Sequence, residues 1–424
     1  MIALAASAVI AREAKASPED VFGFGPRSIA MGGAGAAAGQ GFEAVYANPA
    51  LLSLSREREI TLGLMGAAFD LRAGGEIPYQ ALKGAIIGAV LPIPFGGVLR
   101  DRIALGLGFF TPFDRVVRGR ILYPETPQFL LADRTQSVAV QAGLGLDLGH
   151  GLRLGGGFAA LAALSGDVLV ATDASGRIGT VVEDTLVASY GPIVGASYDV
   201  DSKYRVGVTF RGELIGRFNV VINVRDLGQL TVPPLNISGI AQYDPWQIAV
   251  EAARVDGPWR LAVGATFKHW SAFPGSPEAT VRCPQFDSVT GEPITDPCGA
   301  PVPVDPDYSD TVTPRIGIER SFTPAGGVTL LARGGYFFEP SPAPEQRREA
   351  NGYDSHRSVF TLGYGLELDE PLPPVHLDLF AQIHVLHLRT HEKDADIALT
   401  NAGAARATSR GLVLAAGTTL GVKF

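Results

Sequence analysis

The sequence of 424 residues predicts an all-β fold: a 14-stranded antiparallel transmembrane β-barrel plugged by a small N-terminal hatch. Three observations support this fold class. Apolar residues alternate with small or charged residues along many segments, as in strands whose two faces differ. The connections between these segments alternate between short and long. Charged residues make up only 18% of the chain and glycine 52 of 424 positions, whereas the hydrophobic content is an ordinary 46%.

The composition excludes several other classes of protein. Disordered chains combine low hydrophobicity with high net charge, and the 35 basic and 43 acidic residues give this chain a net charge of only −8. That negative balance also argues against nucleic-acid binding, which usually requires a basic excess. A membrane-spanning helix needs about 20 consecutive apolar residues. The longest uncharged stretches, 84–99 and 227–243, are both broken by proline.

The first residues indicate a targeting segment. An apolar run at 2–11 precedes Ala14, Lys15 and Ala16, which form an A-x-A cleavage pattern. Residues 1–16 are therefore predicted to be a secretory signal peptide. An ordinary apolar N-terminal helix is the alternative interpretation.

Residues 17–55 show no alternation and are predicted to form the hatch inside the barrel. The stretch 25–53 consists mostly of small, uncharged residues, which allow a backbone to pack closely against a wall. The run GAGAAA at 33–38 superficially matches a dinucleotide-binding fingerprint. No buried strand precedes it and no α/β pattern follows, so a cofactor is not expected there.

Residues 56–424 are predicted to form the barrel wall. Its strands carry one apolar face and one small or charged face; Tyr204 and Val206, for example, flank Arg205. The predicted strands are 57–70, 81–95, 102–117, 135–149, 151–166, 185–198, 203–225, 245–254, 259–271, 311–323, 327–339, 356–369, 375–391 and 408–424.

The connections favour a barrel over a soluble sandwich. The short ones are 96–101, 149–150, 199–202, 255–258, 324–326 and 370–374, and the long ones include 118–134, 167–184, 226–244, 272–310 and 340–355. Outer-membrane barrels have short periplasmic turns, long extracellular loops and an even number of strands. A sandwich has no reason to keep that asymmetry. A closed barrel also pairs every backbone N–H and C=O in hydrocarbon.

The end of the chain and the two cysteines fit the same location. The last strand ends on Phe424, which resembles the C-terminal signal read by the barrel-assembly machinery, so that machinery is an expected partner in the bacterial outer membrane. Cys283 and Cys298 lie in a Pro- and Asp-rich stretch. In an oxidising compartment their disulfide would stabilise the fold by about 3 kcal/mol. Two unpaired thiols are the alternative.

The histidines near the C-terminus do not predict a metal site. On a strand, His384 points to one face, whereas His387 and His391 point to the other. Three ligands on two faces cannot converge on one ion, so no metal is expected. The face of His384 is expected to line a polar lumen and also carries His376, Asp378 and Gln382.

Five motifs in order along the chain resemble the FadL/TodX family of outer-membrane long-chain fatty acid and aromatic hydrocarbon transporters. The hatch motif of that family resembles MGGA at 31–34 and NPAL at 48–51, including Asn48, Pro49 and Ala50. Its third-strand region resembles FTPF at 110–113, followed by GR at 119–120. The remaining matches lie at 198–213, 259–271 and 335–357.

The resemblance implies passive transport of hydrophobic molecules, with no cofactor and no enzymatic activity. The ligand would enter an internal pocket and leave laterally through the wall after a hatch movement. The family uses a kink in the third strand as the lateral opening, which implies a kink at Thr111 and Pro112. The apolar lining of that gap would be Phe109, Phe110 and Phe113. The alternative is that Pro112 merely ends the strand.

The resemblance also implies that Phe22 and Phe24 contact a ligand held over the hatch, unless they simply pack the hatch against the wall. Arg211 and Arg333 face the predicted lumen, as does Arg205, and would pair a ligand carboxylate or be balanced by lumen acids such as Glu213. Outer-membrane lipid and lipopolysaccharide are further expected partners. Glu392, Asp394 and Asp396 are expected to form a solvated acidic outer loop, and divalent ions that bridge them to lipopolysaccharide are the alternative interpretation.

Three other functions are compatible with parts of the sequence. A non-transport adaptor for assembly or secretion, built on the same barrel, is the alternative function; a tightly packed polar lumen without an apolar pocket would favour it. The hatch argues against a general porin. An outer-membrane lipase is least favoured, because the sequence shows no nucleophile–base constellation.

Overall fold

The computed structural model describes residues 18–114, 128–129, 131, 138–172, 178–225, 235–273, 285–286, 293–294, 306–347, 351–369, 373–392 and 406–424. Its wall is a closed antiparallel barrel, because β1 pairs with β3 on one side and with β21 on the other. The wall strands are β1 (Glu59–Ala73), β3 (Leu82–Pro92), β4 (Ile103–Pro112), β6 (Ala139–Gly149), β7 (Leu152–Thr172), β8 (Ile178–Asp199), β9 (Tyr204–Arg211), β12 (Gln247–Arg254), β13 (Trp259–Lys268), β16 (Thr311–Ala325), β17 (Val328–Glu339), β19 (Arg357–Leu368), β20 (Val375–Glu392) and β21 (Arg406–Lys423).

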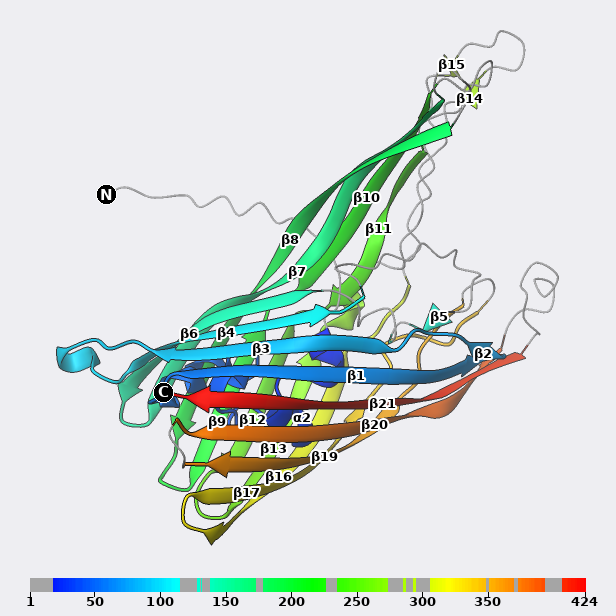
Figure 1. The fold of residues 1–424 in the computed structure, drawn as a ribbon. Coiled ribbons are helices and arrows are strands. Elements are labelled where there is room, and N and C mark those ends of the chain that lie inside the picture. The colour runs from blue at the N-terminus through cyan, green and yellow to red at the C-terminus, as the bar shows by residue number, and fades with distance from the viewer. Residues whose placement is uncertain are drawn as a thin grey trace, which may run out of the picture.

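These 14 strands confirm the predicted fold class, and each predicted segment overlaps one of them. Successive wall strands are hydrogen-bonded neighbours around the whole ring (Figure 1). Short turns connect them at the end where Phe424 lies, which is therefore the periplasmic end. At the junction with the first strand, the N–H of Phe424 donates to the carbonyl of Arg58 at 2.9 Å.

The prediction of one strand over 203–225 was wrong. The wall strand ends at Arg211, and β10 (Leu214–Arg225) leaves the ring to pair in parallel with β7. Pro192 on β8 accounts for the break, because proline lacks the N–H that would extend the β8–β9 ladder. The carbonyl of Pro192 instead accepts the N–H of Gly212 at 2.7 Å.

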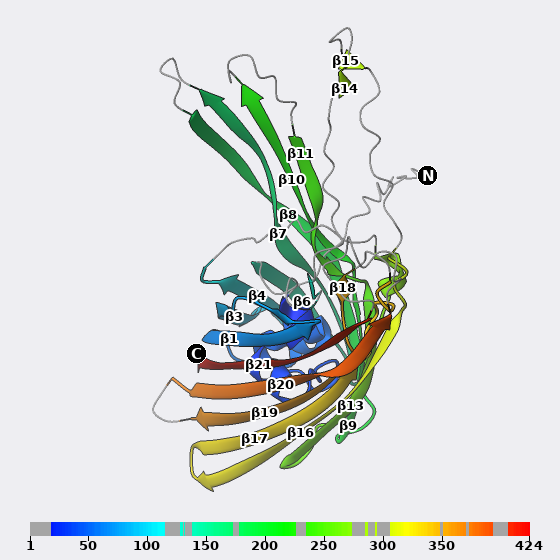
Figure 2. The same cartoon turned by 90° about the vertical axis from the view of Figure 1, so that its right-hand side faces the viewer.

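Two predicted long loops were also wrong. Residues 167–172 continue β7 and residues 178–184 belong to β8, which pairs with it, and 226–244 contains β11 (Leu235–Asp244), which pairs with β10. β7, β8, β10 and β11 run well beyond the other strands (Figures 1 and 2). Beneath them β9 and β12 pair directly, so the extension leaves the ring closed.

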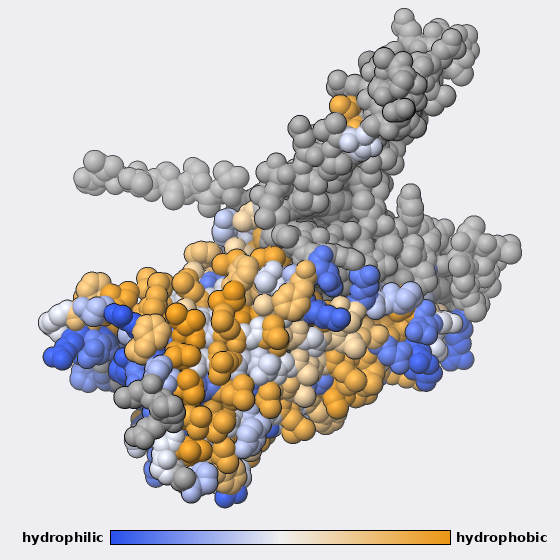
Figure 3. Space-filling view, in the orientation of Figure 1, coloured by the Kyte–Doolittle hydropathy of each residue, from blue (hydrophilic) through white to orange (hydrophobic). Residues whose placement is uncertain are grey.

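The two faces of the wall differ as predicted. On β1, Thr61 is 0% exposed and the next residue, Leu62, is 58% exposed. Figure 3 shows a hydrophobic band across the strands, with hydrophilic residues gathered toward their two ends. The outward apolar face matches the hydrocarbon of a bilayer.

Among the described residues, no helix is both long enough and apolar enough to cross a membrane.

The hatch consists of short helices enclosed by the wall (Figure 2). They are α1 (Pro18–Phe22), α2 (Pro26–Ala30), η1 (Gly41–Glu43), α3 (Ala44–Ala47) and η2 (Pro49–Leu54). Lumen-facing glycines let the hatch approach the strands. A Cβ on Gly155 would lie 2.1 Å from the nitrogen of Ala50, and one on Gly207 would lie 1.9 Å from the carbonyl oxygen of Ala36. Glycine at these positions therefore explains part of the unusual composition.

The remaining described elements lie in turns and loops. They are β2 (Glu76–Ile77), η3 (Gly97–Leu99), β5 (Gln128–Phe129), η4 (Trp270–Ala272), β14 (Gln285–Phe286), β15 (Pro293–Ile294) and β18 (Gly352–Tyr353).

Candidate functional site

The N-P-A motif of the hatch sits against three wall strands. The Asn48 side chain donates to the carbonyl of Ala36 at 2.6 Å and to that of Ala196 on β8 at 3.0 Å. Its Oδ1 accepts the N–H of Ala50 at 3.1 Å, which caps η2. Asn48 thus ties two hatch segments and the wall together, and it is fully buried.

The small-residue run of the hatch encloses a wall carboxylate. Glu251 on β12 accepts four backbone N–H groups, two on each oxygen, at 2.8–3.2 Å. The donors are Gly35, Ala36, Ala37 and Ala38. Successive N–H groups of this kind form an anion-binding nest. The run that superficially resembled a dinucleotide fingerprint therefore holds an internal anion.

Two buried ion-pair clusters also join the hatch to the wall. Nζ of Lys268 donates to Asp20 of α1 and to Glu339 of β17, both at 2.8 Å. On the periplasmic side, Arg27 of α2 pairs with Glu319 of β16. Removing one partner of such a buried pair leaves an uncompensated charge, which is strongly destabilising.

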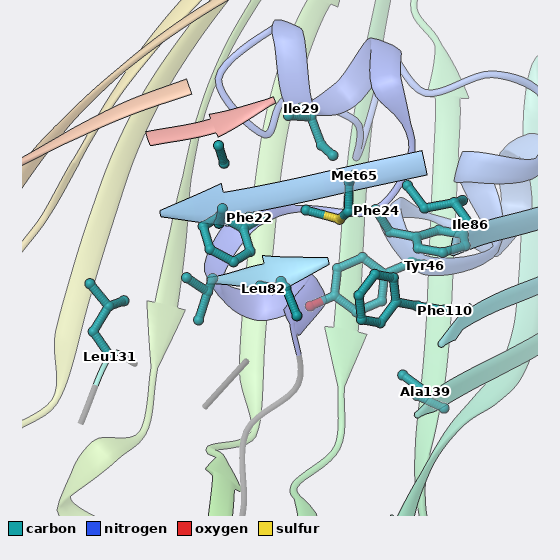
Figure 4. Packing of buried hydrophobic residues seen from close by; sticks show 14 of the residues in the cluster. Phe22, Phe24, Ile29, Tyr46, Met65, Leu82, Ile86, Phe110, Leu131 and Ala139 are labelled. Atoms are coloured by element: carbon teal, nitrogen blue, oxygen red, sulfur yellow. The ribbon is translucent and has the colours of Figure 1, made fainter. Parts of the chain in front are cut away.

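A cavity of about 60 Å³ lies between α1 and the wall. Its apolar lining comes from Phe22 and Phe24 of the hatch, together with Phe337 of β17. The Phe24 ring contacts those of Phe42 and Tyr46 edge-on, at centroid distances of 5.5 and 6.5 Å. Figure 4 shows Phe24, Tyr46 and Phe110 in the same apolar group, with Phe22 nearby. Phe22 and Phe24 therefore adjoin the cavity, although their role in binding stays a prediction.

The two arginines of the predicted ligand site differ in their partners. Arg333 donates to Glu319 at 2.8 Å and pairs with Asp378, so its charge is already compensated. Arg211 lines the cavity, donates to the Tyr46 carbonyl at 3.2 Å, and lies 4.7 Å from the Tyr46 ring centroid. Within the described part of the chain, no carboxylate forms an ion pair with Arg211.

Arg315 on β16 is a second cation on this cavity, and the sequence interpretation missed it. It donates to the carbonyl of Gly33 at 2.7 Å and also forms no ion pair with a described carboxylate. Lys268, Glu251 and Tyr46 were missed as well. Strand parity could have placed the first two in the lumen, but only the tertiary fold shows that they meet the hatch.

The three phenylalanines assigned to the lateral opening do not share a face. Phe110 is buried and points inward, whereas Phe109 is half-buried and Phe113 is 58% exposed on the outer side. The β4–β6 ladder runs from Ile103 to Phe110, so Thr111 and Pro112 lie beyond its end. Pro112 still faces Gly84 of β3 in the β3–β4 register.

Loop segments cover the extracellular side of the lumen. β5 and β18 pair in parallel there, and the rings of Phe129 and Tyr353 lie 6.2 Å apart. Both residues are buried in the same apolar cluster as Phe22. His391 supports this cover: its Nδ1 accepts the N–H of Gln346 at 3.1 Å.

The predicted orientation of His391 was wrong. The β20–β21 register shifts between Leu386 and Arg389, and this bulge returns His391 to the lumen side, where it is fully buried like His384. A bulge adds one residue to a strand and so reverses the parity beyond it. Among the residues that the structure describes, no group of three metal-ligating side chains is close enough to hold an ion.

A second cavity of about 310 Å³ opens at the periplasmic end of the hatch. Glu43 lines it and accepts the N–H groups of Arg27 and Ser28 at 2.8 and 2.7 Å. Burial raises the pKa of the Glu43 carboxyl to about 7, although these hydrogen bonds oppose the shift.

Three predictions fall outside the described residues. Residues 1–16, with the proposed cleavage site, are among them, and so are Cys283 and Cys298. The signal peptide and the disulfide therefore stay predictions. The acidic loop at Asp394 and Asp396 also lies outside the described ranges.

Comparison with known proteins supports a single family. The model of the outer membrane protein transport family (OMPP1/FadL/TodX) matches residues 7–422. A search of curated proteins found no match.

Several solved structures share the fold. A Pseudomonas aeruginosa FadL homologue is 14% identical, with a TM-score of 0.60 over 94% of this chain and 97% of its own. The Ralstonia pickettii toluene transporter TbuX is 16% identical, with a TM-score of 0.55 over 96% of this chain and 99% of its own. The Pseudomonas putida toluene transporter TodX is 15% identical, with a TM-score of 0.54 over 96% of this chain and 99% of its own.

Proposed function

Because the chain belongs to the OMPP1/FadL/TodX family of outer membrane transport proteins, we propose that it carries long-chain fatty acids or hydrocarbons by hatch-gated lateral diffusion. The main support is the cavity between hatch and wall, where aromatic rings adjoin Arg211 and Arg315. Carboxylates line the same cavity, among them those of Asp20, Glu251 and Glu339. Apolar walls beside convergent polar groups are found in ligand sites. Passive diffusion of this kind needs neither a cofactor nor an energy source.

The cavity must enlarge before it can hold such a ligand. Small-molecule sites usually span about 300–1,000 Å³, compared with about 60 Å³ here. The walls are hydrogen-bonded strands, so the hatch is the part that can yield. We take the structure as the closed state of the transporter.

The seam between β4 and β6 is the proposed exit. Leu52 of the hatch packs on Gly106 of β4, and Pro49 packs on Gly143 of β6. Gly106 and Gly143 are themselves partners across the seam. The hatch therefore covers this part of the seam from inside, and the ladder ends at Phe110. Withdrawal of η2 would uncover the seam at Gly143 and at Gly106, which lies on the same strand as Pro112.

A reversible tether at this seam tests the gate. A Cβ on Gly143 would lie 3.5 Å from that of Pro49, within the disulfide range of about 3.5–4.5 Å. The variant Pro49→Cys/Gly143→Cys is made in a Cys283→Ser/Cys298→Ser background and reconstituted into liposomes. Oxidation is expected to reduce fatty acid uptake, and reduction to restore it.

The matched control is Pro49→Ser/Gly143→Ser in the same background, which should not respond to oxidant. Undiminished uptake by the fully oxidised tether would overturn hatch gating at this seam. Uptake would then have to follow a route that does not require the hatch to leave this seam.

The adaptor function is favoured by one observation, the small volume of the enclosed cavity. Uptake no faster than in protein-free liposomes, for both the reduced tether and the unmodified protein, would support the adaptor. Lipopolysaccharide and the barrel-assembly machinery remain proposed partners.

A further inference from the structure

A stacked arginine lies on the lipid-facing side of the barrel, at its periplasmic end. Cζ of Arg320 on β16 is 4.7 Å from the Trp259 ring centroid and 4.5 Å from that of Phe322. Arg320 is exposed, and the two rings are 39% and 41% exposed. Trp259 is the cross-strand partner of Arg320 and the first residue of β13.

The position of Arg320 corresponds to the headgroup level of the membrane. The outward residue before it on β16 is Ile318, which is exposed to the apolar band, and the short turn to β17 follows at Ala325. A charged side chain costs about 2–4 kcal/mol at the bilayer midplane but about 0–1 near an interface. Aromatic residues also gather at the interfaces of such barrels.

The charge of Arg320 has no internal partner. The carboxylate of its strand neighbour Glu319 points into the lumen, where it forms ion pairs with Arg27 and Arg333. Across the described ranges, no carboxylate forms an ion pair with Arg320. The stacked rings hold the guanidinium plane and leave its N–H edge free to donate.

We propose that Arg320, Trp259 and Phe322 form a binding site for the phosphate group of an inner-leaflet glycerophospholipid. Arginine forms paired, charge-assisted hydrogen bonds with phosphate, and the two rings give it a fixed orientation. The neighbouring apolar face would contact the acyl chains. Lipopolysaccharide occupies the opposite leaflet, so charge complementarity and position both favour the phospholipid.

Arg254 offers a matched control. It is the last residue of β12, is exposed on the same outer face, and ends at the same side of the barrel. In the part of the chain that is described, no aromatic ring stacks on Arg254 and no carboxylate pairs with it. It therefore carries the same charge without the stacked geometry.

Native mass spectrometry of the full-length, detergent-solubilised protein tests the site. Phosphatidylglycerol and phosphatidylethanolamine share the phosphodiester, and diacylglycerol lacks it. Both phospholipids are expected to be retained over diacylglycerol. Arg320→Gln should weaken the retention of both phospholipids about tenfold. Losing one charge-assisted hydrogen bond costs about 1.4 kcal/mol, which corresponds to a factor of ten in affinity. Arg320→Lys and Trp259→Leu should give smaller losses, and Arg254→Gln none.

Three outcomes would overturn the proposal. Diacylglycerol retained as well as the phospholipids would show that the phosphate is not recognised. An equal loss in Arg254→Gln would show diffuse charge rather than a site. Displacement of the lipid by millimolar inorganic phosphate would identify a free-anion site. Heat-modified migration in gels verifies that each variant is folded.

Discussion

Oε1 of Glu251 on the barrel wall accepts the backbone N–H of Ala37 in the hatch at 2.9 Å. Three further hatch N–H groups bind the same carboxylate, so one buried wall residue satisfies four donors. No helix or strand could pair these N–H groups in a segment that turns so tightly. The hatch and the wall are therefore joined by backbone groups, which side-chain substitutions in the hatch leave in place.

Replacing Glu251 with Gln is expected to loosen the hatch. The amide keeps one acceptor oxygen but loses the charge and turns an NH₂ group toward backbone donors. A hydrogen bond to a charged group contributes about 1.5–3 kcal/mol, so hatch docking should weaken by at least that amount. Hydrogen exchange should rise at residues 34–38 while barrel amides stay protected. Glu76→Gln, an exposed carboxylate outside the lumen, is the control; unchanged exchange in Glu251→Gln would contradict the assignment.

Two adjacent glycines on β7 should differ in their response to substitution by alanine. A Cβ on Gly155 meets the backbone of Pro49 and Ala50 at 2.1–2.2 Å, whereas one on Gly156 has no atom within 4 Å among the described residues. Overpacking of this kind costs about 1–3 kcal/mol. Gly155→Ala should therefore lower the thermal unfolding midpoint or raise ion leakage through the barrel. Gly156→Ala should do neither, and similar effects of both would refute the close packing of the hatch.

Hatch docking should weaken as the pH rises from about 5 to 8. The Glu43 carboxyl has a pKa of about 7 when docked, against 4.5 in its unperturbed state, so the docked hatch binds the extra proton in this range. Its stabilising contribution is complete below pH 4.5 and is lost as the pH passes 7, a change of about 3 kcal/mol. Single-channel leak currents at pH 5 and pH 8 measure this effect. Glu43→Gln should remove the pH dependence, and an increase in leak on acidification would reverse the expected sign.

The two lumen arginines should separate substrate recognition from stability. Arg211 forms no ion pair with a described carboxylate, and Arg211→Gln should lower uptake of a fatty acid several-fold relative to an alkane of equal length. Arg333 holds Glu319 and Asp378 together, so Arg333→Gln should mainly destabilise the protein. Parallel uptake and thermal unfolding assays compare the two. Equal losses for fatty acid and alkane in Arg211→Gln would exclude carboxylate recognition there.

The wall could be predicted from the sequence because the two faces of a half-buried strand differ in polarity. Apolar and polar or small residues therefore alternate along the chain. Tyr204, Val206 and Val208 are all exposed on the membrane side, whereas Arg205 and Thr209, on the opposite face of the same strand, are buried in the lumen. The same rule failed wherever the period changed. The bulge beyond Leu386 reversed His391, and Pro192 ended the ladder that β9 would otherwise have continued. Both are local irregularities of the backbone, which a search for strict alternation does not detect.

The candidate site was predicted less fully. Phe22, Phe24 and Arg211 were named and adjoin the cavity, but Arg315, Lys268 and Glu251 were not. These residues sit on wall strands far from the hatch in sequence, and their roles arise from which hatch atoms face them. Alternation tells which side of the wall a residue occupies. It does not tell its height in the lumen or the hatch segment it meets.

The pairing of β1 with β21 has a consequence for assembly. Glu59 and Lys423 are partners across the closing seam, so the ring cannot form before nearly the whole chain is available. The hatch precedes every wall strand, yet Gln382 of β20 donates to the carbonyl of Phe22 at 2.9 Å. The hatch residues are synthesised first among the described residues, but some of their hydrogen-bond partners are synthesised near the end of the chain. The barrel must close around its own N-terminus, which makes enclosure of the hatch and ring closure a single, highly non-local step.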